Sequence, residues 1–328
     1  MQVKAFCTST ALLLAVAGST VAAQTMSATH WLQRLQNAQA SQAYQGAFVY
    51  ERKGAFSSHQ VVRQASPEGQ IVEHFTQLSG PAHEVLRVDG VVACASAALA
   101  DDLTVIDVWP QASVTVQDLP QWYDVQVVGE TRIAGRDAAV LLFSPRDQHR
   151  YPIEMSVDTL TAVPLQSLLL NEKGQLLERL QFVQFSSAPE QTAPLANLQD
   201  LTPGAGCIPL QAPAMNREAV AEKDWAVNWT PPGFSLLKSH YQVAYEHDGS
   251  VLNQVYSDGL AHFSVYIENI DNLEVESSRR QLGPTAVVSK KIQRADETLM
   301  VTVVGEIPLG SAERIALSMH AGQDLSDD

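Results

Sequence analysis

The stretch AAVLLFSPRDQHRYPIEMSVDTLTAVPLQSLLLNEKGQLLERLQFVQF (residues 138–185) decides the fold of this chain. Its apolar residues fall into four short runs, at Ala138–Phe143, Ile153–Val157, Pro164–Leu170 and Leu176–Phe185. Turn-forming residues such as Pro145 separate the runs, and no helix is predicted between them. Short, regularly spaced strands without intervening helices favour an antiparallel meander.

The two faces of these strands differ in polarity. Ile153–Asp158 alternates apolar and polar residues, as a half-buried strand should. Ala138–Phe143 and Leu168–Leu170 are instead apolar on both faces. A sheet that hides both faces needs a helix on one side and an apolar layer on the other. That layer is either a second part of the core or a cavity that holds a lipid chain, and the residues leave both open.

The N-terminal part of the chain predicts one helix followed by further strands. Residues 27–43 predict a helix, because Trp31, Leu32, Leu35 and Ala38 recur at helical spacing. Strands separated by turn residues are expected next, around residues 48–50, 61–62, 71–78 and 85–92.

A second domain is expected after a linker. Residues 187–222 are rich in Pro, Ala, Gln and Gly, which is typical of a linker or a long crossing loop. Residues 223–328 then predict a smaller mixed domain that closes with a helix at Ser311–His320. Its strands are expected at Phe234–Val243, Val251–Tyr256, Phe263–Ile267, Val287–Ile292 and Leu299–Val304. The chain is therefore expected to be α+β, with its large antiparallel sheet in residues 24–186.

The first residues predict export. Lys4 is followed by the apolar run Ala11–Ala17 and by the small residues Val21–Ala23, so residues 1–23 read as a signal peptide cleaved before Gln24. The protein is then expected to be soluble outside the cytoplasm. Its formal net charge of −15 disfavours nucleic acid as a partner. Cys94 and Cys207 remain after cleavage, and a disulfide is the simplest interpretation, with two separate buried thiols as the alternative.

A search for catalytic motifs is mostly negative. The sequence has no Gly-x-Ser-x-Gly elbow, no phosphate-binding loop, no Cys-x-x-Cys and no metal-ligand spacing of histidines. We therefore expect no enzyme, no cofactor and no metal. A hydrolytic triad drawn from Ser144, His149 and the nearby aspartates stays open as a rival.

Two groups of basic residues are either solvated rims or sites for carboxylates and phosphates. The first group lies at strand ends of the meander and comprises Arg132, Arg136, Arg146 and Arg150. The second lies in the smaller domain and comprises Arg279, Arg280, Lys290, Lys291 and Arg294.

Eight long strings occur in a fixed order along the chain: Tyr44–Arg52, Trp122–Asp124, Gly129–Arg136, Pro145–Tyr151, Ser167–Glu178, Pro231–Phe234, Asp258–Ala261 and Val301–Glu306. In these strings the chain resembles the RseB/MucB family of periplasmic negative regulators of the envelope-stress sigma factor, and its MucB members most. The resemblance spans nearly the whole mature chain and includes the pair Cys94 and Cys207.

The resemblance implies a large domain like the lipoprotein carrier LolA, with a curved half-barrel sheet, helices on its concave side and room for acyl chains. It implies that the smaller domain helps to bind the periplasmic segment of an RseA/MucA-like anti-sigma factor. Binding would shield that segment from a site-1 protease until lipopolysaccharide or another lipid displaces the regulator. A homodimer stays open, and the rival function is a lipid or lipoprotein carrier.

The family implies no catalytic residues, so the candidate sites are binding surfaces. The candidate lipid-cavity residues are Phe48, Tyr50, Val85, Leu142, Leu168, Leu170 and Phe182. The candidate partner-binding residues are Tyr256, Asp258, Arg279, Arg280, Lys290, Lys291 and Arg294.

Overall fold

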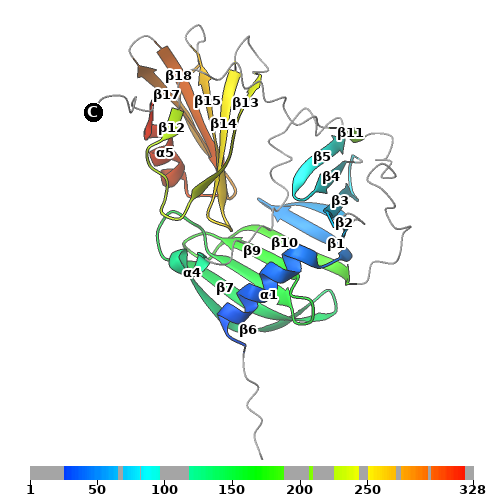
Figure 1. The fold of residues 1–328 in the computed structure, drawn as a ribbon. Coiled ribbons are helices and arrows are strands. Elements are labelled where there is room, and N and C mark those ends of the chain that lie inside the picture. Colours follow the sequence, from blue (N-terminus) through cyan, green and yellow to red (C-terminus); the bar gives the residue numbers. More distant parts are fainter. Residues whose placement is uncertain are drawn as a thin grey trace, which may run out of the picture.

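The structure is a computed structural model, and it shows two antiparallel sheets of unequal size (Figure 1). The residues that it describes are 26–65, 69–81, 83–96, 118–187, 207–209, 225–243, 250–270, 275–294 and 297–321. The predicted signal peptide lies outside them. Among the described residues, no helix combines the length and the apolar character needed to cross a bilayer.

Eleven strands form the first sheet, in the spatial order β11-β5-β4-β3-β2-β1-β10-β9-β8-β7-β6. Because β10 pairs with β1, the start and the end of the first half of the chain meet in the middle of this sheet. The bounds are β1 Tyr44–Arg52, β2 Ala55–Ala65, β3 Ile71–Gln77, β4 Glu84–Val88, β5 Val91–Ser96, β6 Tyr123–Ile133, β7 Arg136–Pro145, β8 Ile153–Asp158, β9 Pro164–Leu170, β10 Leu176–Ser186 and β11 Cys207–Pro209.

Helix α1 (Ala28–Ser41) lies across the half of this sheet that contains β6 to β10 (Figure 1). The helix begins after Ser27, whose side chain accepts a hydrogen bond from the backbone N–H of His30 at 3.3 Å. Its buried stripe is Trp31, Leu32, Leu35 and Ala38, which packs against Leu141, Phe143 and their neighbours. The helical spacing of the sequence therefore predicted both the helix and its buried face.

Six strands form the second sheet, in the order β13-β14-β15-β18-β17-β16. Helix α5 (Leu309–Leu317) packs on one face and buries Ala312, Ile315 and Ala316 against the sheet. A short pair, β12 (Trp225–Val227) with β19 (Met319–Ala321), lies beside it. The remaining bounds are β13 Ser235–Val243, β14 Ser250–Ser257, β15 His262–Asn269, β16 Ser278–Leu282, β17 Thr285–Arg294 and β18 Glu297–Gly305.

The observed fold corrects the predicted class in one respect: the chain is mostly β rather than α+β, because its described helices are only α1, α5 and the short α4 (Leu119–Trp122). The four predicted strands of the meander and the five of the second domain are all present. Strand β16 was missed because four of its five residues are polar and all five are exposed, so it lacks an apolar alternation. The predicted boundaries at residues 186 and 223 stay a prediction, since most of residues 187–222 lies outside the described part of the chain.

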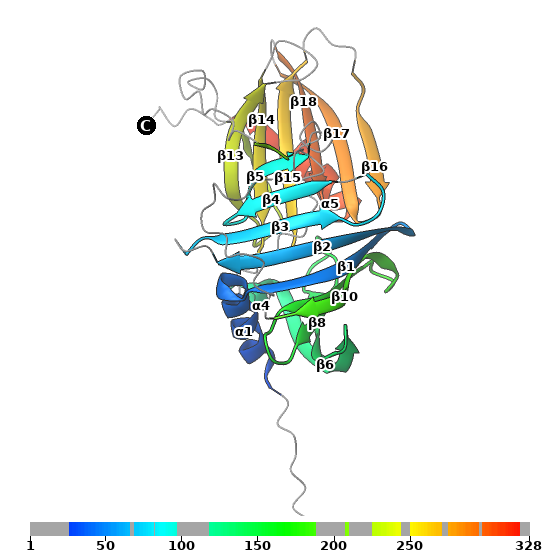
Figure 2. The same ribbon diagram turned by 90° about the vertical axis from the view of Figure 1, so that its right-hand side faces the viewer.

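Figure 2 shows the second sheet standing next to the half of the first sheet that contains β1 to β5. The contact between the two sheets is made by loops and strand ends, and it places several charged residues at their junction.

Candidate functional site: a cavity at the junction of the two sheets

A cavity of about 600 Å³ lies between α1, the inner face of the first sheet and the loop between β14 and β15. Ligand pockets in proteins have about 300–1,000 Å³. Gly259, Leu260, His262 and Glu306 bring the second sheet and its loops into the wall, so both sheets bound the cavity. Its apolar wall includes Phe48, Val61, Phe75, Met155, Leu169, Leu180 and Phe182.

Two of the predicted lipid-cavity residues, Phe48 and Phe182, line this cavity. Val85 is fully buried in the core behind it, and Tyr50 packs at the edge of the same core. Both belong to the inner face of the sheet without being in the cavity wall.

The structure places the other three predicted cavity residues on the opposite face of the sheet. Leu142 and Leu168 both pair with Glu154, and Leu170 lies two residues beyond Leu168 on the same side. Their neighbours Leu141 and Leu169 face inward instead. Successive side chains of a strand alternate between faces, and a run that is apolar on both faces does not reveal which residues face the cavity.

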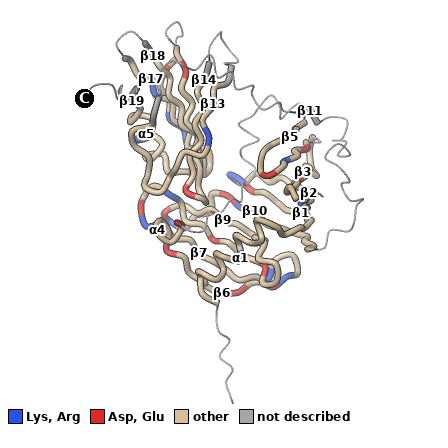
Figure 3. Tube along the Cα trace, viewed as in Figure 1, with Lys and Arg blue, Asp and Glu red and all other residues tan. Residues whose placement is uncertain are grey.

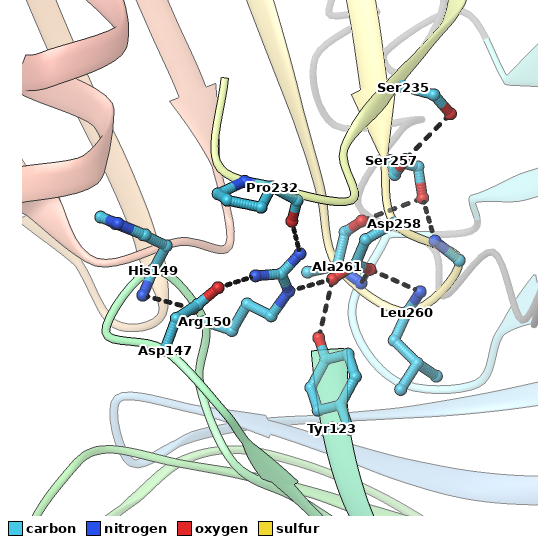
Figure 4. A network of polar contacts seen from close by, with 11 residues as sticks. Tyr123, Asp147, His149, Arg150, Pro232, Ser235, Ser257, Asp258, Leu260 and Ala261 are labelled. Carbon is cyan, nitrogen blue, oxygen red and sulfur yellow. Dashed lines mark hydrogen bonds and ion pairs between the residues drawn. The ribbon is translucent and has the colours of Figure 1, made fainter. Parts of the chain in front are cut away.

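The junction itself is organised around Arg150, whose side chain has no exposed surface (Figure 4). Its Nε donates to the Asp258 carboxylate at 2.5 Å, and its two terminal nitrogens donate to the Asp147 carboxylate and to the carbonyl oxygen of Pro232. Tyr123 donates to the same Asp258 oxygen at 3.0 Å. One buried cation therefore joins the first sheet to two segments of the second.

Asp258 is held from its own side as well. Its other carboxylate oxygen accepts the backbone N–H groups of Leu260 and Ala261, at 2.9 and 2.8 Å. This loop carries Leu260 into contact with the core under α1. Burial and the charge of Asp258 raise the pKa of Tyr123 well above its ordinary value, so this hydroxyl keeps its proton.

Gly233 fits the junction because it lacks a side chain. Its φ is +89°, and a Cβ at this position would lie 2.3 Å from the Trp122 ring. The string Pro231–Phe234 thus packs directly on the string Trp122–Asp124. The strings Pro145–Tyr151 and Asp258–Ala261 contribute Arg150 and Asp258 to the same place. Four strings that are distant in the sequence therefore meet at the junction.

A second polar cluster lies where the cavity reaches the other end of the junction. Tyr50 donates to the Glu178 carboxylate at 2.6 Å, and Arg52 lies 3.8 Å from it. Arg52 also donates to the Thr285 hydroxyl of the second sheet. Burial and the charge of Glu306 raise the pKa of Glu178 to about 7, and burial also raises the pKa of Glu306. Sequence reasoning missed both carboxylates, because nothing local distinguishes them from surface glutamates.

The basic residues of the smaller domain do not form one patch. Arg279 and Lys290 lie on the α5 side of the sheet, where both contact Glu313, at 3.3 and 2.6 Å. Arg280 and Lys291 are exposed and alternate to the other face. The side chain of Arg294 lies outside the described residues. Lys and Arg positions are scattered over both sheets (Figure 3).

The other candidate partner residues are not on the surface. Tyr256 is 7% exposed and stacks on Phe263, while Asp258 is 5% exposed and bound to Arg150. Among the basic residues of the first sheet, Arg136 pairs with the buried Asp158, and Arg150 is at the junction rather than on a solvated rim. The assignment of these residues to a partner-binding surface stays a prediction.

The rival hydrolytic triad is not assembled. His149 Nδ1 lies 2.9 Å from the hydroxyl of Ser311 in the second sheet's helix, and Asp147 binds the His149 backbone and Arg150. Ser144 pairs along the strands with Asp124. In the described ranges no group of three His, Cys, Asp or Glu side chains is arranged to hold a metal ion.

Cys94 is buried in β5, and its backbone pairs with Pro209 of β11. Cys207 begins β11 and pairs with Ser96, two residues from Cys94. The predicted linker is therefore attached to the edge of the first sheet by backbone pairing. The side chain of Cys207 lies outside the described residues, so the disulfide stays a prediction.

Comparison with known proteins identifies relatives of this chain. The profile of the MucB/RseB N-terminal domain matches residues 27–202, and that of the MucB/RseB C-terminal domain matches residues 219–320. The sigma factor AlgU regulatory protein MucB of Pseudomonas aeruginosa is 46% identical over 95% of this chain and 97% of its own. The sigma-E factor regulatory protein RseB of Escherichia coli K12 is 29% identical over 89% of this chain and 90% of its own.

A solved structure has the same fold. The MucB chain in the complex of Pseudomonas aeruginosa MucA and MucB aligns with a TM-score of 0.75 and 44% identity, and covers 90% of this chain and 99% of that one. The crystal structure of MucB in complex with the periplasmic part of MucA aligns with a TM-score of 0.74. The two profiles together match both sheets apart from β11. The junction is built from the strings on which the resemblance was first seen. The chain belongs to the MucB/RseB family of regulatory proteins.

Proposed function

We propose that this protein is a periplasmic negative regulator of a sigma-E-type envelope stress response. It binds the periplasmic segment of a membrane-spanning anti-sigma factor and shields that segment from site-1 proteolysis. An acyl-chain lipid, such as lipopolysaccharide, enters the cavity and releases the bound segment. The relatives named for regulation of AlgU and sigma-E, and the MucB structures with the periplasmic part of MucA, support this assignment.

The observation that carries the proposal is the composition of the cavity wall. Residues of the first sheet, of α1 and of the loop between β14 and β15 all contribute to it. A ligand that fills the cavity therefore interacts with both sheets and favours one relative arrangement of them. A partner that binds across both sheets prefers its own arrangement, so ligand and partner weaken each other's binding by the same factor.

The test uses the full mature chain, the periplasmic segment of its anti-sigma factor and a site-1 protease. We expect the chain to slow cleavage of the segment, and added lipopolysaccharide to restore it. A chain that leaves cleavage unchanged at saturating concentration contradicts the regulatory function.

The rival function, a lipid or lipoprotein carrier, predicts a different result in the same experiment. A carrier moves acyl chains between vesicles and leaves cleavage of the anti-sigma segment unchanged. Transfer between labelled donor and unlabelled acceptor vesicles, measured beside the cleavage assay, separates the two functions.

A further inference from the structure

A row of charged side chains crosses the otherwise apolar inner face of the first sheet. Arg63 on β2, Glu73 on β3 and Arg87 on β4 are paired neighbours across these strands, and all three line the cavity. Glu73 lies 2.6 Å from Arg63 and 3.3 Å from Arg87. Two guanidinium groups thus share one carboxylate, which leaves an excess of one positive charge in this row.

The two arginines differ in how fully they are bound. Arg63 donates to the carbonyl oxygens of Gln39 and Gln42 at the end of α1, in addition to Glu73. Arg63 therefore links the helix to the sheet, and its guanidinium already donates to these three acceptors.

Arg87 has far fewer partners, although its side chain is only 3% exposed. In the described part of the chain it has the ion pair with Glu73 and a stacking contact with the Phe75 ring at 4.5 Å. The ion pair is made by its buried Nε, which lies 3.3 Å from Glu73 Oε2 without forming a hydrogen bond to it. A guanidinium has five N–H donors, and leaving such donors unpaired in an apolar setting is costly. Burial lowers the pKa of Arg87, and only the charge of Glu73, with a smaller contribution from Tyr44, opposes that.

We infer that Arg87 binds the carboxylate of a single-chain fatty acid whose hydrocarbon tail lies along the apolar wall of the cavity. The inference rests on the proposed function and specifies its ligand. A carboxylate accepts two parallel bonds from a guanidinium and carries the one negative charge that the row lacks. Phe75 beside the guanidinium, followed by Val61, Phe48 and Phe182, offers the tail a continuous apolar surface.

The site has a defined polarity along the cavity. Glu178 and Glu306 line the cavity where the second sheet joins it, and both have raised pKa values. An anionic head group is repelled by any ionised carboxylate there and attracted to Arg87, so the tail points toward the junction. A tail that occupies the cavity then affects the residues that join the two sheets.

The test compares ligands that differ only in the head group, with binding to the full mature chain measured by calorimetry. Laurate is expected to bind at least about tenfold more tightly than dodecanol or methyl laurate, because only laurate forms charge-assisted bonds. In Arg87→Met this preference is expected to disappear while dodecanol binds as before. Arg132→Met is the matched control, because Arg132 is exposed and, within the described ranges, donates only to the Gly135 carbonyl oxygen near its own turn.

Each outcome supports or contradicts the carboxylate site, the proposed function or both. Equal binding of laurate and dodecanol to the unchanged chain overturns the carboxylate site and leaves the lipid-responsive function standing. A laurate preference that survives in Arg87→Met places the head group elsewhere and overturns the site. Failure of all three ligands to bind overturns both. If Arg87→Met does not fold, Arg87→Lys replaces it, and the loss of the planar fork is expected to reduce the preference for laurate.

Discussion

Arg150 is fully buried, and its guanidinium reaches one carboxylate of its own sheet and two acceptors of the other. An arginine cannot lose its proton to escape burial, so its partners must supply the compensation. Asp258 and Asp147 do so here, and Phe234 stacks at 4.8 Å from the guanidinium. Arg150 is therefore the buried cation among several contacts that fix the relative position of the two sheets.

Arg150→Met is expected to lower the free energy of unfolding by about 3–5 kcal/mol, because it leaves the buried Asp258 carboxylate without its cation. Urea unfolding followed by circular dichroism measures the change. Arg146→Met is the control: Arg146 and Asp124 are more than half exposed and 4.0 Å apart, so its loss is expected to stay below about 1 kcal/mol. Equal losses in the two variants contradict the role given to Arg150.

At the scale of elements, β11 is the least expected strand. It consists of Cys207–Pro209, within a proline-rich stretch that predicts a linker, and it pairs with the edge strand β5. Such a short strand gains little from its own pairing. The predicted disulfide between Cys94 and Cys207, which together enclose more than a hundred residues, would hold it at this edge.

We expect reduction of the chain to lower its free energy of unfolding by about 4 kcal/mol, from the loss of a long closed loop in the unfolded state. Thermal unfolding with and without dithiothreitol measures this. Cys207→Ser is expected to unfold at the temperature of the reduced chain and to ignore the reductant. A chain whose unfolding temperature is the same in both conditions has two separate thiols.

The hairpin of β16 and β17 is the other element with a specific expectation. Arg280 and Lys291 are exposed on its face away from α5, whereas Arg279 and Lys290 are bound to Glu313 on the other face. In the described part of the chain Arg280 and Lys291 have no ion pair, whereas Arg279, although its side chain is 59% exposed, shares Glu313 with Lys290. Charge reversal at Arg280 and Lys291 therefore tests the predicted partner surface without breaking an ion pair within the described residues.

The double change Arg280→Glu and Lys291→Glu is expected to weaken binding of the anti-sigma segment about tenfold, with a smaller effect at high salt. Surface plasmon resonance at two salt concentrations measures it. Arg132→Glu, an exposed charge reversal on the first sheet, is expected to leave affinity unchanged. Unchanged affinity in the double variant removes this hairpin from the docking surface.

At the scale of the whole molecule, the carboxylates Glu178 and Glu306 make the junction sensitive to pH. The pKa of Glu178 is raised from 4.5 to about 7, so the folded chain binds more protons than the unfolded chain between these values. The stabilisation of the folded chain that comes from the raised pKa of Glu178 is complete below pH 4.5 and is lost as the pH rises through 7. The hydrogen bond from Tyr50 and the charges of Arg52 and His262 oppose the rise in the pKa of Glu178 without cancelling it.

Glu178→Gln is expected to reduce this dependence, because an amide keeps the shape of the group but cannot titrate. The difference in free energy of unfolding between the native chain and the variant should change by at most about 3 kcal/mol between pH 4.5 and pH 7. The native chain has to be compared with the variant because other groups also make its stability depend on pH. Burial lowers the pKa of His59 to about 4, and this shift makes stability rise with pH, opposite to the effect of Glu178. Parallel curves for the two proteins contradict the assignment.

The sequence by itself determined most of the strands and the long helix. Turn residues and strand alternation predicted β7 to β10, and the stripe Trp31, Leu32, Leu35 and Ala38 predicted α1, because these patterns act over a few neighbouring residues. The long matching strings determined the family for the same reason: they are read without knowing where they meet in space.

Only the tertiary structure decided which residues form the cavity and the junction. Leu168 and Leu169 are indistinguishable in an apolar run, and the register of β9 turns one outward and the other toward the cavity. Arg150, Glu178 and Arg87 look like ordinary surface charges until strands far apart in the chain surround them. Burial and electrostatic environment depend on contacts between distant segments, so these functional residues emerge from the fold and not from local sequence.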